Sequence, residues 1–214
     1  MPGIPKLDLM LGRAGPVTGC GMVVRQQVEG EAEPYIVATD GACQRNPGPA
    51  GWAWVAADGH WAAGSIEAGT NNIGELLGLL HAIRDHAHVP KLVVQADSMY
   101  AINSYSLWMD SHARRGWRTS TGAPTKNADI LAMLIDARDA RKASGMPDVV
   151  LEHVRGHSGH RLNGWADERA VRAAQHGAEG RELIWTTHRA AERIDVSVDA
   201  PAAGADKPVR RAKK

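Results

Sequence analysis

The chain has 214 residues, enough for one domain of ordinary size with extensions, and its 43% hydrophobic and 23% charged residues exclude a fibrous or wholly disordered protein. Its 25 Lys and Arg residues nearly balance 24 Asp and Glu residues, so a nucleic-acid partner has to be argued from local patches. Two cysteines are too few for a disulfide framework, and no apolar run approaches the ~20 residues that span a bilayer, so we expect a cytoplasmic protein with no membrane partner.

A leader precedes the first strands. Residues 1–33 mix glycine, proline and single charges without a sustained period, which predicts a flexible leader. The β-prone run 35–40 follows, and the runs 52–56 and 60–65 then flank an Asp–Gly pair, which is a common hairpin signal. Three antiparallel strands are therefore expected at the start of the domain.

Strands and helices alternate after these three strands. Apolar residues recur every three or four positions over 73–87, which predicts an amphipathic helix. Later segments are predicted as strand 91–96, helix 98–108, helix 128–143, strand 148–154 and helix 164–175. This order predicts an α/β fold with a mixed sheet, three antiparallel strands followed by parallel ones, and helices on both faces.

The last part of the chain changes in composition. Residues 179–214 are Ala-rich, and the final stretch 201–214 holds five Lys or Arg residues and one Asp. Such a segment buries too little apolar surface to fold, so we expect a basic, disordered tail. The folded domain is therefore predicted to span residues 34–178.

Four carboxylates stand at unusual places in the predicted fold. Asp40 and Asp97 each end a strand, Glu75 lies near the start of the first helix, and Asp167 lies early in the last helix. The carboxyl ends of neighbouring parallel strands share one edge of a sheet, so these acids are expected to converge there. Clustered carboxylates repel one another without cations, and all-oxygen ligands favour Mg²⁺ or Mn²⁺. Two such ions can clamp the attacking and leaving oxygens of a phosphodiester displacement.

Each acid also has a purely structural interpretation. Asp40 can open a turn, Glu75 can complete a capping box with Asn72, Asp97 can cap the helix after it, and Asp167 can be a solvated helix position. Taken singly, these interpretations are favoured, and only the joint pattern argues for a metal site.

Four segments carry that joint pattern: TDGACQRNPGPAGW (39–52), TNNIGEL (70–76), QADSMYAI (95–102) and VRGHSGHRLNGWAD (154–167). In this order and spacing they resemble type 1 ribonuclease H, the family that cleaves the RNA strand of RNA–DNA hybrids. The resemblance implies a five-stranded mixed sheet and a two-metal-ion endoribonuclease that leaves 5′-phosphate and 3′-hydroxyl ends. It implies that Asp40, Glu75, Asp97 and Asp167 bind two Mg²⁺ ions, with Mn²⁺ as a substitute, and that His157 assists catalysis or product release.

The same resemblance implies substrate contacts. It places the Cys43 backbone and the side chains of Asn46, Asn71 and Asn72 at the minor groove of the hybrid, and Thr70 and Asn127 at a phosphate of the DNA strand. The basic segment 110–126 resembles a protrusion that tracks phosphates, with Trp108, Arg114, Arg115 and Trp117 as its contact residues. The alternatives are turn chemistry for the asparagines and a solvated charged loop for the segment.

The sequence departs from the family pattern at three places. His112 replaces an aromatic residue of some relatives, Ala68 replaces an arginine beside Thr70, and Gly164 replaces a common acid. None of these departures touches the four acids. We therefore expect a monomeric ribonuclease H with a hybrid duplex as its partner, against two alternatives: a non-catalytic nucleic-acid-binding module of the same fold, and a relative acting on DNA.

Overall fold

The computed structural model describes residues 33–156, 158–179 and 184–186. The predicted leader lies outside the described residues, apart from residue 33. Within the described ranges no helix combines the length and the apolar character needed to cross a membrane.

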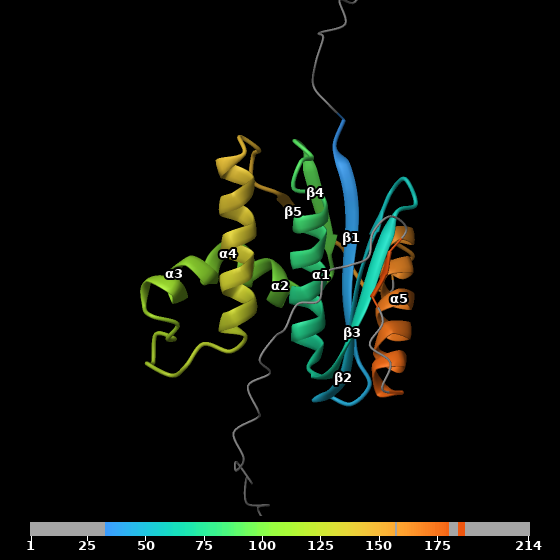
Figure 1. The fold of residues 1–214 in the computed structure, drawn as a ribbon, viewed down its shortest axis with the longest axis horizontal. Helices are drawn as coiled ribbons and strands as arrows, with labels where there is room; N and C mark the ends of the chain where they lie inside the picture. The colour runs from blue at the N-terminus through green and yellow to red at the C-terminus, as the bar shows by residue number, and fades with distance from the viewer. Residues whose placement is uncertain (1–32, 157, 180–183, 187–214) are drawn as a thin grey trace, which may run out of the picture. The chain divides into compact units, whose positions relative to one another are not determined.

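The strands form one mixed sheet (Figure 1). Its order is β5-β4-β1-β2-β3-β6. The first three strands pair antiparallel, whereas β4 pairs parallel with both β1 and β5. The predicted arrangement, three antiparallel strands followed by parallel ones, is therefore confirmed. The bounds are β1 Tyr35–Cys43, β2 Gly48–Ala56, β3 Trp61–Gly69, β4 Leu92–Ala96, β5 Val150–His153 and β6 Ile184–Thr186.

The hairpin between β2 and β3 forms at the predicted Asp–Gly pair. Gly59 has a φ of 92°, a left-handed conformation that glycine adopts without strain, and the Ala56 amide donates to the His60 carbonyl at 2.7 Å. Strand β2 begins at Gly48, four positions before the predicted start. The glycines and proline of 48–51 suggest a turn, but Ala50 and Gly51 pair with both neighbouring strands.

The helices are α1 Asn71–Asp85, α2 Met99–Asn103, the π-helical turn η1 Ser104–Trp108, α3 Met109–Arg114, α4 Ala128–Ala143 and α5 Arg161–Ala178. The predicted helix 98–108 thus continues through α3. Helix α5 begins three residues before the predicted start, because Asn163 and Gly164 suggest a boundary but lie inside its first turn.

Helices cover both faces of the sheet, as predicted (Figure 1). Helix α1 packs on one face with α4 beside it, and α5 crosses β1, β2 and β3 on the other. The α1 side is a core of larger apolar residues such as Leu76, Leu80 and Leu134. The α5 side is lined by alanines, including Ala53, Ala63, Ala166, Ala170 and Ala173, so that this helix lies close to the strands.

The five predicted strands are present as β1 to β5, and a sixth, short strand extends the sheet beyond them. Residues Ile184–Thr186 pair antiparallel with Ala62–Gly64 of β3, within the segment from residue 179 that is predicted as a tail. Three residues are too few to show the alternation that identifies a strand in sequence. Residues 180–183 and 187–214 lie outside the described residues.

Candidate active site

Two glycines bring helix α1 against the sheet. A Cβ on Gly41 of β1 would lie 2.1 Å from the Glu75 amide nitrogen, and a Cβ on Gly74 would lie 2.5 Å from the Gly51 carbonyl oxygen. Backbones can approach this closely only without side chains between them. The approach places Glu75 directly beside Asp40, the residue before Gly41.

Asp40, Glu75 and Asp97 form one cluster. Each offers a carboxylate oxygen, and these oxygens all lie within 4.8 Å of one another. The register that pairs Thr39 of β1 with Ala96 of β4 places Asp40, inside β1, beside Asp97, which directly follows β4. The predicted convergence of these three acids is therefore present in the structure.

Asp167 joins the cluster from the opposite face. It is partly buried in α5, and its charge raises the pKa of both Asp40 and Glu75, although it lies outside the tightest group of three. The four acids thus come from strand β1, from the position directly after strand β4, and from helices α1 and α5.

Burial and mutual repulsion dominate the electrostatics of the cluster. Asp40 and Glu75 are 6% and 5% exposed. Burial raises the pKa of Asp40 to about 7, the charges of Asp97 and Asp167 add to this, and a Gly41 N–H bond to Asp40 Oδ1 at 2.7 Å opposes it. Burial, followed by the charges of Asp40, Asp97 and Asp167, raises the pKa of Glu75 well above its ordinary value. Glu75 Oε2 has no hydrogen-bond partner among the described residues.

The structural interpretations of three acids are wrong. Thr70, not Asn72, caps α1, since its hydroxyl accepts the Ile73 amide at 3.3 Å. Ser98, not Asp97, caps α2. Asp40 lies inside β1, which continues to Cys43, so it opens no turn. These three carboxylates have no capping or turn role that would explain their position.

Two asparagines contact the cluster. Asn71 Nδ2 donates to Glu75 Oε1 and Asn163 Nδ2 donates to Asp97 Oδ2, each at 3.4 Å. Asn163 is a site residue that the sequence motifs do not predict. It is 3% exposed, and its Oδ1 has no partner among the described residues. The sequence feature that could identify Asn163 as a site residue is its spacing, because Asn163 and Asp167 are four residues apart and therefore share a helix face.

The polar residues near the β1–β2 turn divide into exposed and inward-facing ones. Asn46 and Asn72 are exposed, and Thr70 is partly buried because it caps α1. The Cys43 thiol lies 3.1 Å from the Arg45 carbonyl and within 3.7 Å of the Gly69 carbonyl, and burial raises its pKa. This thiol therefore faces the strand ends and is poorly suited to act as a nucleophile.

The predicted contact residues of the basic segment have different surroundings. Trp108 is 38% exposed, whereas Trp117 packs against the core on a backbone with φ of 59°. Arg115 donates to the Arg118 carbonyl, and Arg114 makes no hydrogen bond or ion pair within the described part of the chain. Trp117 thus anchors the segment.

Two further predicted residues lie apart from these groups. Asn127 precedes α4 and donates from Nδ2 to the Tyr100 hydroxyl at 2.9 Å. His157 lies outside the described residues. Its neighbour Gly156 lies against Asp97, because a Cβ there would be 2.5 Å from Asp97 Oδ2.

The chain is similar to proteins of known family. The family model RNase H matches residues 32–175. Ribonuclease HI of Streptomyces coelicolor is 37% identical over 149 residues, which cover 66% of this chain and 62% of that protein. The chain therefore spans less than two thirds of that relative. Ribonuclease H of Tropheryma whipplei is 35% identical over 140 residues, covering 65% of this chain and 83% of the relative.

Solved structures give the same picture of the fold. The crystal structure of a type 1 RNase H with a type 2 active-site motif, LC9-RNase H1, has a TM-score of 0.52 at 28% identity and covers 68% of this chain and 75% of that one. A foamy viral protease-reverse transcriptase in complex with RNA/DNA hybrid has a TM-score of 0.55 at 14% identity, covering 69% of this chain and 21% of that one. The second likeness concerns the fold alone.

Proposed function

The chain belongs to the RNase H family, and on that premise we propose that it hydrolyses the RNA strand of RNA–DNA hybrids with divalent metal ions held by its four acids. The observation that carries the proposal is the cluster of Asp40, Glu75 and Asp97, with oxygens within 4.8 Å of one another and two of the three side chains buried. Buried carboxylates without cationic partners are costly, so a fold that assembles them has a ligand for them.

The donor set fits hard divalent cations. All candidate ligand atoms are carboxylate oxygens, which suit Mg²⁺ and Mn²⁺ and not the softer metals. The unpartnered Glu75 Oε2 and the raised pKa of Asp40 both indicate that a positive charge belongs here. When bound, two Mg²⁺ ions supply Lewis-acid stabilisation to the attacking oxygen and the leaving oxygen of a phosphodiester displacement. Because the 3′-oxygen leaves, the products carry 5′-phosphate and 3′-hydroxyl ends.

Backbone and side-chain donors around the acids orient them. The Gly41 N–H fixes Asp40 Oδ1, and the amides of Asn71 and Asn163 hold Glu75 and Asp97. We propose that His157, one residue from the Gly156 contact with Asp97, moves a proton during catalysis or product release. An imidazole suits this task, because its ordinary pKa lies near neutrality.

The proposed substrate surface extends from the acids along α1 and the basic segment. The exposed amides of Asn46 and Asn72 can both donate and accept at a minor groove lined on one strand by 2′-hydroxyls. We further propose that Asn71 and the Cys43 backbone share this groove, that Thr70 and Asn127 hold a DNA phosphate, and that Trp108, Arg114, Arg115 and the anchored Trp117 form the distal phosphate surface.

Cleavage of an end-labelled RNA–DNA hybrid with Mg²⁺ tests the proposal. The unmutated protein should cleave the hybrid but not matched RNA–RNA or DNA–DNA duplexes, and Asp40→Asn should lose activity. Asp136→Asn, which removes an exposed carboxylate of α4, is the matched control and should retain it. Tight hybrid binding without cleavage, with Mn²⁺ also tried, would indicate a binding module, and cleavage of the DNA duplex would indicate a DNA-acting relative.

A further inference from the structure

The basic arm, defined here as residues 104–126, carries several positive charges and a single negative one. It comprises η1, α3 and the loop after them. Its basic residues are Arg114, Arg115, Arg118 and Lys126, and Asp110 is its only acid. A lone carboxylate among residues proposed to meet phosphates opposes binding unless another group neutralises it.

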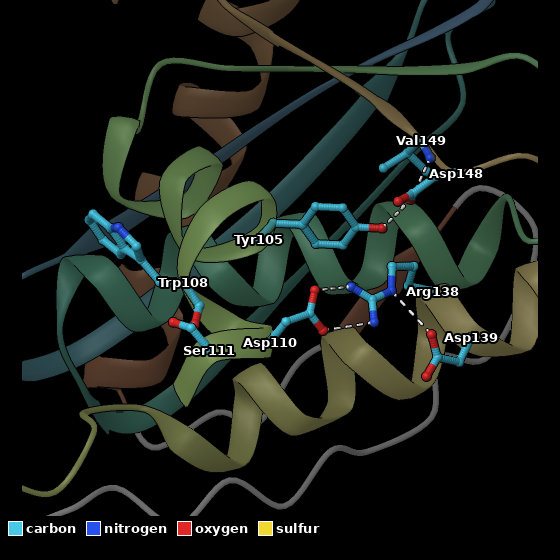
Figure 2. A network of polar contacts seen from close by, with 8 residues as sticks. All are labelled: Tyr105, Trp108, Asp110, Ser111, Arg138, Asp139, Asp148 and Val149. Atoms are coloured by element: carbon cyan, nitrogen blue, oxygen red, sulfur yellow. Dashed lines mark hydrogen bonds and ion pairs between the residues drawn. The ribbon is translucent and has the colours of Figure 1, made fainter. Parts of the chain in front are cut away.

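Arg138 of helix α4 neutralises Asp110. Its guanidinium makes two parallel contacts, Nη1 to Oδ2 at 2.8 Å and Nη2 to Oδ1 at 3.0 Å, and the two side chains face one another between α3 and α4 (Figure 2). The pairing lowers the pKa of Asp110, so the acid is charged and held. Bidentate pairs of this kind fix direction as well as distance.

A second contact holds the base of the arm. The hydroxyl of Tyr105, in η1, donates to Asp148 Oδ1 at 2.5 Å, and the same oxygen accepts the Val149 amide at 2.7 Å (Figure 2). Tyr105 and Met109 are buried. The arm therefore stays attached to the domain through these groups even when the Asp110–Arg138 pair is removed.

Arg114 is the arginine that depends on this arrangement. It lies four residues after Asp110 on the same helix, the spacing at which an acid and a base attract one another, and its charge already lowers the pKa of Asp110. The other two arginines are engaged within the arm: Arg115 contacts the Arg118 carbonyl and Ser111, and Arg118 contacts the Gly122 carbonyl. Arg114 makes no such contact in the described ranges, so its guanidinium is available to a ligand.

We propose that Arg138 is a positioning residue for hybrid binding, because its bidentate pair with Asp110 keeps Arg114 free to bind a backbone phosphate of the duplex. Without Arg138, Asp110 turns to Arg114 and withdraws it from the substrate. Arg138 itself touches no substrate in this arrangement. The inference rests on the proposed function, since it concerns affinity for the same hybrid.

Steady-state kinetics on a labelled hybrid test this role. Arg138→Met should raise KM about three- to tenfold, the effect of losing about one phosphate contact, and leave kcat and the Mg²⁺ requirement unchanged. The slope of log KM against log salt concentration should fall by about one. The double variant D110N/R138M frees Arg114 again and should restore KM to within about twofold of the unmutated value, a rescue that a merely structural role of Arg138 does not predict.

Arg172→Met is the matched control, because it removes one exposed positive charge from α5 and should change KM by less than about twofold. An unchanged KM in R138M, an equal loss in R172M, or a double variant as weak as R138M would each overturn the proposal. Fluorescence anisotropy with the hybrid in an Asp40→Asn background gives the same comparison as Kd values. If the protein does not cleave hybrids at all, the proposed function fails, while these Kd values still decide the role of Arg138.

Discussion

Neutralising Asp40 should make the metal-free protein more stable at alkaline pH. The folded protein holds a proton on Asp40 up to about pH 7, whereas an ordinary Asp loses it near 3.8. The unfolded chain therefore releases this proton at lower pH, and stability falls as pH rises from about 4 to about 7. Asn at position 40 retains an oxygen for the Gly41 N–H bond and removes the charge, so it removes this cost.

The magnitude follows from the same pKa. The difference between about 7 and 3.8, at 1.36 kcal/mol per unit, sets a ceiling of about 4 kcal/mol above pH 7. A gain of about 2 to 4 kcal/mol corresponds to roughly 5 to 15 °C in Tm for a domain of this size. At pH 5 the unfolded Asp is already ionised while the folded one is still protonated, so the advantage of Asp40→Asn should fall to about a third of its value above pH 7, and it should vanish only below about pH 4.

Thermal melts in EDTA at pH 5 and pH 8 measure this difference, with Asp136→Asn as the control that should stay within about 1 °C at both pH values. Added Mg²⁺ should then raise the Tm of the unmutated protein more than that of Asp40→Asn, because a bound cation offsets the repulsion among the acids. An Asp40→Asn Tm at pH 8 that equals or falls below the unmutated value would refute the reasoning, as would an advantage that is the same at both pH values.

Four further substitutions test the packing and hydrogen bonding of the domain. Gly74→Ala should destabilise the fold by about 2 kcal/mol or more and impair cleavage, because its Cβ would lie 2.5 Å from the Gly51 carbonyl oxygen. Gly164→Ala has open space around its Cβ and should stabilise the fold by about 0.5–1 kcal/mol. Urea titrations and hybrid cleavage check both variants. Asn163→Ala should lower Mg²⁺ affinity about 10- to 100-fold by releasing Asp97, measured by calorimetric titration; an unchanged affinity would remove Asn163 from the site. Arg141→Met should cost about 3 kcal/mol in urea unfolding, because it removes the donor to three backbone carbonyls, and should leave the kcat of the folded enzyme unchanged.

The parts of the site that follow local rules could be predicted from sequence. Asp40 and Asp97 are expected together because each stands at the end of a β-prone run, and adjacent parallel strands bring such positions to one edge. The structure places them side by side, although β1 continues past Asp40 to Cys43. The hairpin at Gly59 followed from turn chemistry. The strand and helix order gave the mixed sheet with helices on both faces, since each element was long enough to show its period.

The parts that depend on distant contacts could not be predicted in this way. Arg138 is 28 residues from Asp110, and no spacing rule connects them. The three-residue strand β6 is too short to show a period, and it exists only because β3 offers an edge. The inward position of Trp117 depends on a left-handed backbone conformation that is uncommon for tryptophan. In each case the deciding partner lies elsewhere in the chain.

The π-helical turn η1 sets which way the side chains of helix α3, which follows it directly, are turned about the helix axis. Its Met109 amide bonds to the Ser104 carbonyl five residues earlier, so this turn contains one more residue than an α-helical turn between the same two hydrogen-bonded groups. One residue corresponds to about 100° of rotation about a helix axis. Asp110 therefore faces Arg138, and Arg114 projects from the arm, because of helical phase and not only because of side-chain identity. Inserting or deleting a residue in η1 would consequently disturb the Asp110–Arg138 pair, just as replacing one of the two charged residues would.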